Sequence, residues 1–142
     1  MALEVQVAMD ASDPSGLAEF WALALGYVRQ PPPPGHDSWE AFAEVNGMAH
    51  LLGERDALVD PEGLGPRLYF QRVPEEKAGK NRVHLDIRAS KGAEDEVERA
   101  RLVGEHVARL VAAGARVLWE VDEPAGRCTV LADPEGNEFC VA

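Results

Sequence analysis

"ALVDPEG" at residues 57–63 returns as "VLADPEG" at residues 130–136, and this repeat decides the fold. A shared tetrapeptide could arise by chance, since Asp-Pro and Glu-Gly steps are common in turns. Its setting is more informative, because each copy closes a half of the chain that reads as a strand, a long helix and further strands. The repeat therefore predicts two βαβββ modules, about residues 1–75 and 81–142.

The first module begins with an alternating, valine-rich strand over residues 3–10 and a helix within residues 12–27. Ser12 or Asp13 can cap the helix, and Gly26 suits its end. An apolar stripe at helical spacing predicts its buried face: Leu17, Phe20, Trp21, Ala24 and Leu25.

Residues 31–50 interrupt the first module. The four prolines of "PPPPG" cannot donate hydrogen bonds to a sheet and favour a stiff spacer. A short amphipathic helix is predicted over residues 37–47, followed by two strands in "DALVDPEG" and "PRLYFQRV".

The second module opens with the predicted strand 82–88, within which "VHLDIR" alternates. Apolar side chains share one face: Val83, Leu85 and Ile87. Polar side chains share the other: His84, Asp86 and Arg88. The apolar face is explained as core, so the polar face raises the question of a site.

The longest helix is predicted within residues 92–115, with acids near its start and a core face of valine and leucine: Val103, Val107, Leu110 and Val111. Three strands follow, at residues 116–122, 127–133 and 138–142. The fold class is therefore α+β: two modules whose sheets pair edge to edge into a cupped sheet with helices outside. This arrangement would turn Gln6, His84 and Asp86 toward a cavity.

The composition, 46% apolar and 27% charged, is that of an ordinary globular domain of 142 residues. A net charge of −11 disfavours nucleic-acid binding, and no apolar run is long enough for a membrane helix. Because acids stand where a signal peptide would be basic, we expect a cytoplasmic protein with reduced cysteines, Cys128 and Cys140.

The basic segment "KAGKNR", residues 77–82, has two interpretations. Charge runs are usually solvated loops. Alternatively, the segment could attract an anionic small molecule to the neighbourhood of His84.

The chain resembles the vicinal oxygen chelate superfamily, and within it the glyoxalase-like proteins. The resemblance rests on "DASDPSGLAEFWALALGY", "KNRVHLDI" and the terminal "DPEGNEFCVA". It spans nearly the whole chain and implies the paired-module fold. It implies less about chemistry, because the superfamily includes isomerases, dioxygenases, resistance enzymes and antibiotic-binding proteins.

Metal-dependent members take ligands from the first and last strand of each module, usually histidine and glutamate. By resemblance, these positions fall at Gln6, Gln71, His84 and Cys140 in this chain. Only the histidine is preserved, and two amides, an imidazole and a thiol supply no anionic oxygens. The set weighs against a divalent metal cofactor, although thiolate and imidazole could hold zinc, and Asp86 or Glu138 could substitute.

Three functions stay open. The first is a small-molecule-binding protein with a degenerate ligand set, using Gln6, Gln71, His84 and Cys140 to bind an organic ligand, which the basic segment would favour if the ligand is anionic. The second is an enzyme: either a metal-dependent lyase, isomerase or dioxygenase, or a metal-free catalyst with His84 and Asp86 as its acid–base pair. The third is a structural module. The resemblance also implies a homodimer.

Overall fold

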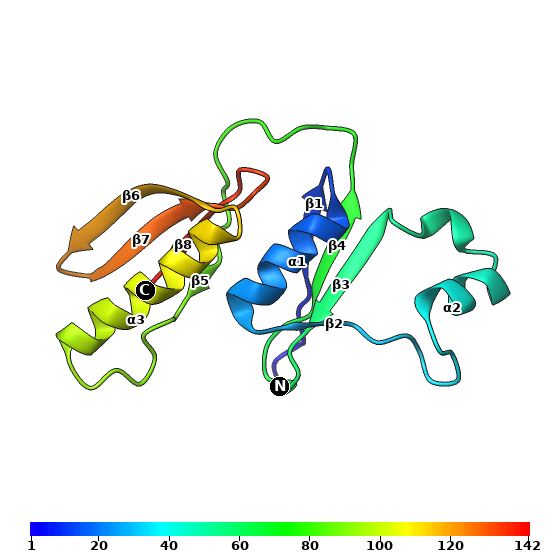
Figure 1. Cartoon of the computed structure of the whole chain (residues 1–142), viewed down its shortest axis with the longest axis horizontal. Helices are drawn as coiled ribbons and strands as arrows, with labels where there is room; N and C mark the ends of the chain where they lie inside the picture. Colours follow the sequence, from blue (N-terminus) through cyan, green and yellow to red (C-terminus); the bar gives the residue numbers. More distant parts are fainter. The chain divides into compact units, whose positions relative to one another are not determined.

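The computed structural model describes all 142 residues and divides into two compact units, Met1–Glu76 (unit 1) and Lys77–Ala142 (unit 2). Each unit has a strand, a helix and three further strands, and each sheet is four-stranded and mixed (Figure 1). The predicted α+β class with two βαβββ modules is therefore confirmed. None of the helices is long and apolar enough to cross a membrane.

Unit 1 contains five elements of the module and two of the inserted segment. The module elements are β1 (Val7–Ala11), α1 (Pro14–Leu25), β2 (Val28–Arg29), β3 (Arg55–Val59) and β4 (Leu68–Arg72). The sheet order is β1-β4-β3-β2, with β1 parallel to β4 and the other pairs antiparallel. Between β2 and β3 lie α2 (Trp39–Val45) and the 3-10 helix η1 (Ala49–Leu51).

Helix α1 begins and ends where its residue types favour a helix boundary. The Asp13 side chain accepts a hydrogen bond from the Gly16 amide at 3.1 Å, and Pro14 stands at the first helical position. Gly26 ends the helix in the left-handed conformation, with φ of 72°. The predicted stripe is buried except at Leu25, which is half-buried. It packs on the sheet face formed by Leu58, Leu68 and Phe70.

Unit 2 repeats this plan without an insertion. Its elements are β5 (Asp86–Ile87), α3 (Glu96–Ala112), β6 (Arg116–Glu123), β7 (Gly126–Ala132) and β8 (Glu138–Val141). The order is β5-β8-β7-β6, with β5 parallel to β8. Its core contains Leu110, Leu131, Phe139 and Val141, all almost fully buried.

Three sequence predictions differ from the structure. The first strand begins at Val7, since residues 1–6 are exposed. The opening strand of unit 2 is only two residues long, because the chain before it bends and the His84 side chain contacts the Asn81 carbonyl. Val111 is 45% exposed: it follows the fully buried Leu110, and one step of 100° turns it off the core face.

Both copies of Asp-Pro-Glu-Gly form the same turn. In each copy the glycine amide donates to the aspartate carbonyl, at 3.0 Å for Gly63 to Asp60 and 2.9 Å for Gly136 to Asp133. Each aspartate carboxylate also accepts from the amide two residues ahead, at 2.9 Å. Positive φ angles of 71° and 89° explain why glycine closes both turns. The sequence repeat is thus also a structural repeat.

Candidate functional site

One face of each sheet is turned away from its helix, and Gln71 lies on this face in unit 1, whereas Gln6 and His84 precede the first strands of their units. In unit 1, strand register aligns Asp10 of β1, Gln71 of β4 and Arg55 of β3 in one row across the sheet. The next row contains Ala8, Tyr69 and Ala57. Alternation places both rows opposite the buried Leu68 and Phe70.

The two predicted glutamines of unit 1 are already engaged by neighbouring side chains. The Oε1 atom of Gln6 accepts a hydrogen bond from the Nη1 of Arg67. The Nε2 of Gln71 donates to the Asp10 carboxylate at 2.8 Å. Gln6 is therefore in contact with a cation, and Gln71 orients a carboxylate.

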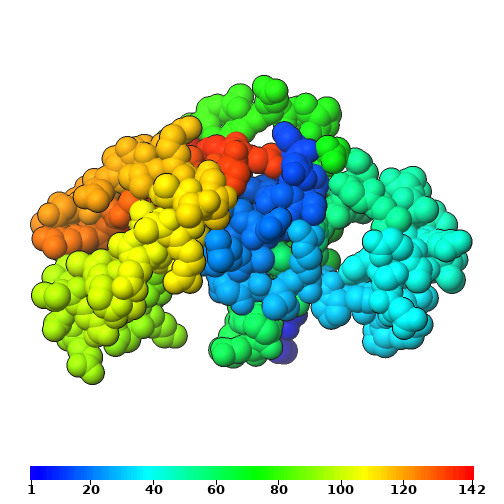
Figure 2. Space-filling view, viewed as in Figure 1, coloured from blue at the N-terminus to red at the C-terminus, as the bar shows by residue number.

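A pocket of about 240 Å³ lies between the inserted segment and the sheet of unit 1. Figure 2 shows the inserted segment as a cyan lobe with a hollow between it and the body of this unit. The lobe contributes apolar side chains to the pocket: Trp39, Phe42, Ala43, Met48, Leu51 and Leu52. The sheet contributes Arg55, Asp56, Ala57, Arg67 and Tyr69, and Gln30 lies at the end of β2. The pocket is thus mainly apolar with a few polar groups at one wall.

The aromatic wall is held in place by two kinds of contact. The indole N–H of Trp39 donates to the Gln30 carbonyl at 2.8 Å, which ties α2 to the chain after β2. The Phe42 ring packs edge-to-face on Trp39 and on His36, with centroids 5.6 Å and 5.1 Å apart. His36 therefore supports the pocket wall.

The charges at the pocket do not cancel. The Asp56 carboxylate pairs with the Arg29 guanidinium, so its charge is compensated. Arg67 contacts only neutral groups, donating to the Gln30 side chain at 2.6 Å and to Gln6, with its guanidinium 5.3 Å from the Tyr69 ring centroid. The Arg55 side chain forms no hydrogen bond or ion pair. The pocket wall is therefore positive.

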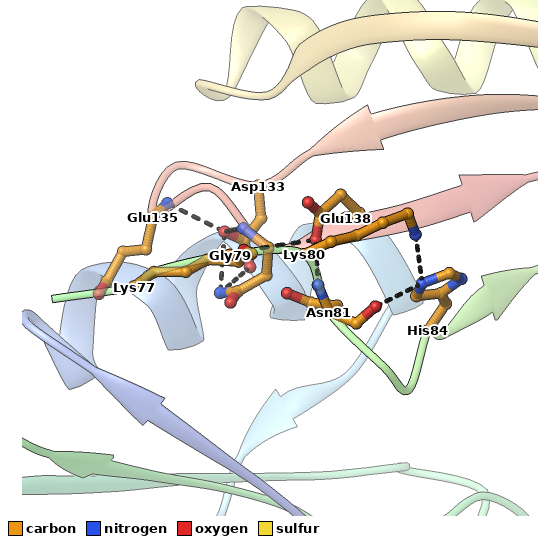
Figure 3. A network of polar contacts seen from close by, with 9 residues as sticks. Lys77, Gly79, Lys80, Asn81, His84, Asp133, Glu135 and Glu138 are labelled. Atoms are coloured by element: carbon orange, nitrogen blue, oxygen red, sulfur yellow. Dashed lines mark hydrogen bonds and ion pairs between the residues drawn. The ribbon is translucent and has the colours of Figure 1, made fainter.

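In unit 2, His84 contacts the basic segment that precedes it. Its Nε2 lies 3.0 Å from the Lys80 ammonium and 3.1 Å from the Asn81 carbonyl (Figure 3). A neutral ring with Nε2 unprotonated accepts from Lys80, whereas an Nε2–H donates to Asn81. The nitrogen cannot do both at once, so its two contacts belong to different states of the ring.

Glu138 contacts the same basic segment, residues 77–82, at Asn81 and Lys77. Its carboxylate accepts a hydrogen bond from the Asn81 amide at 3.0 Å and lies 3.4 Å from the Lys77 ammonium (Figure 3). The Asn81 hydrogen bond is the main cause that lowers the pKa of Glu138, and Lys77 adds to it. Lys77 and Lys80 therefore have partners within unit 2, Glu138 and His84. These contacts make both lysines less available to an anionic small molecule.

Asp86 and Cys140 are partners across the parallel strands β5 and β8. Burial, with smaller effects from the neighbouring Cys128 and Asp86 side chains, raises the pKa of the Cys140 thiol to about 12. The two cysteines are free and in contact, a relation that the sequence left open. Because the thiolate is the reactive form, Cys140 is an inert thiol at neutral pH.

The sequence from residue 6 to residue 142 matches the glyoxalase-like domain family. The chain belongs to this family. No curated protein sequence matches it.

Solved structures share the fold of this glyoxalase-like protein. A glyoxalase/bleomycin resistance/dioxygenase family enzyme from Burkholderia phytofirmans PsJN is 15% identical, with a TM-score of 0.62 over 96% of this chain and 94% of that one. The fosfomycin resistance protein FosX from Mesorhizobium loti is 10% identical, with a TM-score of 0.57 over 99% and 90%. The bleomycin-binding protein from Streptomyces verticillus, solved with copper(II)-bleomycin, is 18% identical, with a TM-score of 0.56 over 100% and 96%.

The residues at the superfamily's ligand positions do not fit a divalent metal. Gln6 already binds the Arg67 guanidinium, and His84 faces the Lys80 ammonium, so each donor has a cation beside it. Cys140 keeps its proton at neutral pH, although the thiolate is the form that binds metal. Within either unit, no three His, Cys, Asp or Glu side chains form a cluster that could hold a metal ion.

The acid–base pair stays a prediction. Asp86 and Cys140 interact, while His84 contacts Lys80 and Asn81. Strand register also bears on the module equivalences. Gln71 stands opposite Asp10 in the register as Cys140 stands opposite Asp86, and by the same register Ala8, two residues before Asp10, corresponds to His84.

The pocket residues were missed by the sequence reasoning, which treated the proline run as a spacer and the next helix as a generic amphipathic one. The available signal was Trp39 and Phe42, three residues apart on a seven-residue helix. Side chains at this spacing lie on the same face. A helix this short can bury such a face only against another element, and here that element is the sheet.

Proposed function

We propose that this glyoxalase-like protein binds a small organic molecule in the pocket of unit 1, without a bound metal. The observation that carries the proposal is the pocket itself. It has an apolar, partly aromatic lobe wall and a few polar groups on the opposite sheet wall. Ligand sites of proteins have this composition, with apolar area supplying affinity and fixed polar groups supplying orientation.

The structural relatives support a binding function. One of them is named as a bleomycin-binding protein, and others are named as fosfomycin resistance proteins. Small-molecule recognition thus recurs on this fold. The donor chemistry at Gln6, His84 and Cys140 also disfavours metal coordination.

A cytoplasmic location and a homodimer belong to the same proposal, the first from the composition and the second from the superfamily resemblance. Light scattering coupled to size-exclusion chromatography tests the homodimer. A mass of about 15.4 kDa would indicate a monomer, and twice that value a dimer.

The binding proposal is tested by thermal unfolding in the presence of EDTA. A collection of one- and two-ring organic compounds is screened against the protein, because a ligand that binds only the folded state must raise its Tm. At a concentration about 100-fold above its Kd, such a ligand adds about 2.7 kcal/mol and raises the Tm by about 5–10 °C.

Two tryptophan variants locate the binding. Trp39 lines the pocket and is 37% exposed, whereas Trp119 lies on β6 of unit 2 and is 47% exposed. We expect Trp39→Ala to abolish most of the Tm rise and Trp119→Ala to keep it. Binding that requires added metal, or that disappears in Trp119→Ala alone, would contradict the proposal.

The metal-dependent alternative has its own test. Metal content is measured in untagged protein purified without chelator, beside a His84→Ala control. We expect no stoichiometric metal in either sample. About one metal per chain, lost in the control, would favour the enzyme instead.

A further inference from the structure

We propose that the pocket of unit 1 selects an organic anion, namely an aromatic carboxylate of one or two rings. This inference rests on the proposed function and adds to it the chemical class of the ligand. It comes from three features of the pocket: an uncompensated positive wall, a fixed guanidinium and an aromatic wall opposite to them.

The uncompensated charge belongs to Arg55 and Arg67. The one carboxylate at the pocket, that of Asp56, is paired with Arg29. Arg67 bonds to neutral amide oxygens, and Arg55 has no bonded partner. Two guanidiniums without a carboxylate therefore face one pocket, in a chain whose net charge is −11. An anion entering the pocket meets the charge that the chain does not itself neutralise.

The Arg67 guanidinium is held in a fixed orientation. Its Nε donates to the Gln30 side chain at 2.6 Å, its Nη1 donates to Gln6, and the group lies over the Tyr69 ring. These contacts leave the Nη2 donors available. Because the group is already ordered, a bound carboxylate would not have to immobilise it, and charge-assisted bonds of this kind are among the stronger ones.

The pocket wall formed by the inserted segment is suited to an aromatic ring of the ligand. Trp39 and Phe42 present aromatic surface, and Met48, Leu51 and Leu52 add flexible apolar area around it. The volume of about 240 Å³ lies just below the range of roughly 300–1,000 Å³ that is typical of drug-sized ligands. A ligand of one or two rings fits this size, with its carboxylate directed toward the sheet wall.

The basic segment at residues 77–82 is a weaker candidate for anion binding. The Lys77 ammonium pairs with Glu138, and the Lys80 ammonium contacts His84. Neither lysine lines the apolar pocket of unit 1. In unit 1, by contrast, the positively charged Arg55 and Arg67 line the same pocket as the aromatic side chains Trp39 and Phe42.

The test compares 1-naphthoate with 1-naphthamide by isothermal titration calorimetry at neutral pH in EDTA. The two probes have the same rings and differ in charge. We expect wild-type protein to bind the carboxylate about tenfold more tightly than the amide, which corresponds to about 1.4 kcal/mol. This ratio tests the charge preference without any substitution.

Substitutions then test which arginines cause the preference for the carboxylate. Arg55→Gln and Arg67→Gln are each expected to reduce the carboxylate-to-amide ratio to about twofold or less. The affinity of each variant for the amide is measured beside its affinity for the carboxylate, so that the ratio isolates the effect of charge. Arg116→Gln, an exposed arginine on β6 of unit 2, is the matched control and should keep the wild-type ratio.

Each outcome separates the two proposals. If both probes bind equally well, the anion proposal fails while the binding function stands. If folded wild-type protein binds neither probe while the thermal screen finds another ligand, this inference fails and the binding function stands. A carboxylate preference that persists in both Arg55→Gln and Arg67→Gln places the anion elsewhere and overturns this inference.

Discussion

Units 1 and 2 share one plan but differ in the connection between their second and third strands. In unit 2, β6 and β7 are joined by a two-residue turn between Glu123 and Gly126. In unit 1, residues 30–54 separate β2 from β3, yet β3 and β4 keep their antiparallel register. A long insertion into the β2–β3 hairpin thus leaves the pairing of these strands intact, because the free-energy cost of a longer loop grows slowly with its length. The insertion then supplies a pocket wall that unit 2 lacks.

The Asp-Pro-Glu-Gly turn, which both units share, also differs between them, because its two aspartates are buried to different extents. Asp133 is 3% exposed and accepts from the Glu135 and Asn137 amides and from the Asn137 side chain. Asp60 is half-buried and accepts from the amides of Glu62, Leu64 and Gly65. The same sequence thus makes a buried turn in unit 2 and a more exposed one in unit 1.

The largest expected effect is that of Asp133→Ala. The substitution leaves the half-buried donors of Glu135 and Asn137 without this acceptor, and we expect it to lower the free energy of unfolding by about 3 kcal/mol. Asp60→Ala is the matched control. We expect it to lose less stability, because water can replace more of the hydrogen bonds of the more exposed Asp60. Chemical denaturation of the two variants measures the difference. Equal losses would mean that burial does not distinguish the two turns.

Gly65→Ala is the next effect and tests a feature of unit 1 alone. A Cβ at Gly65 would lie 2.0 Å from the Tyr27 hydroxyl oxygen, which has to move for the methyl group to fit. We expect a loss of about 1–2 kcal/mol in the free energy of unfolding, as for other overpacked positions. Gly104→Ala on α3, where the added atom meets nothing within 4 Å, should be neutral or stabilising. A neutral Gly65→Ala would show that Tyr27 moves freely.

A smaller effect concerns alkaline pH and unit 2. The thiol of Cys140 has a pKa of about 12 in the folded protein and 9.0 as its ordinary value, so the unfolded chain loses this proton first. Unfolding is therefore favoured as pH rises from about 9 to 12, and the stability contributed by the neutral thiol is lost. We expect about 1 kcal/mol over this window, because the side chain is partly exposed.

Urea unfolding curves of wild type and Cys140→Ala at several pH values measure this effect. The gap between the two proteins should change between pH 9 and 12 and stay constant between pH 7 and 8. Gln71→Ala is the control in unit 1, because Gln71 holds the position that corresponds to Cys140 and has no proton to lose. A constant gap over the whole range would mean that Cys140 ionises normally.

The smallest effect concerns acid pH. The pKa of Glu138 is lowered below its ordinary value of 4.5, chiefly by the Asn81 hydrogen bond, so its charged form stabilises the folded state. This stability is present above pH 4.5 and is lost as pH falls through the lowered pKa. We expect Glu138→Gln to be slightly less stable than wild type at pH 7, with a difference that shrinks below pH 4.5. Thermal unfolding from pH 3 to 7 measures it, and a difference independent of pH would contradict this account.

The fold could be predicted because its determinants are local and repeated. Asp13 and Gly26 mark the ends of α1, and the repeated Asp-Pro-Glu-Gly turn identifies the two modules. The strand before Asp86 was predicted too long, since alternation does not reveal that His84 contacts Asn81 through its side chain.

The pocket could not be predicted in the same way. It depends on residues from four separate segments, among them Trp39, Arg55 and Arg67, that come together only when the insertion packs on the sheet. Nor does the sequence reveal that Arg29 neutralises Asp56 while Arg55 is left without a partner. Which charges compensate one another is a property of the folded chain.

The most direct test of the central claim is a nuclear magnetic resonance titration of isotopically labelled protein with 1-naphthoate in EDTA. The indole N–H signal of Trp39 reports on the pocket, because this group bonds to the Gln30 carbonyl beside it. We expect this signal and the amide signals of Arg55 and Tyr69 to shift together, while the Trp119 indole signal stays in place. Shifts confined to His84, Cys140 and Trp119, or shifts that appear only after a divalent metal is added, would contradict metal-free binding in unit 1.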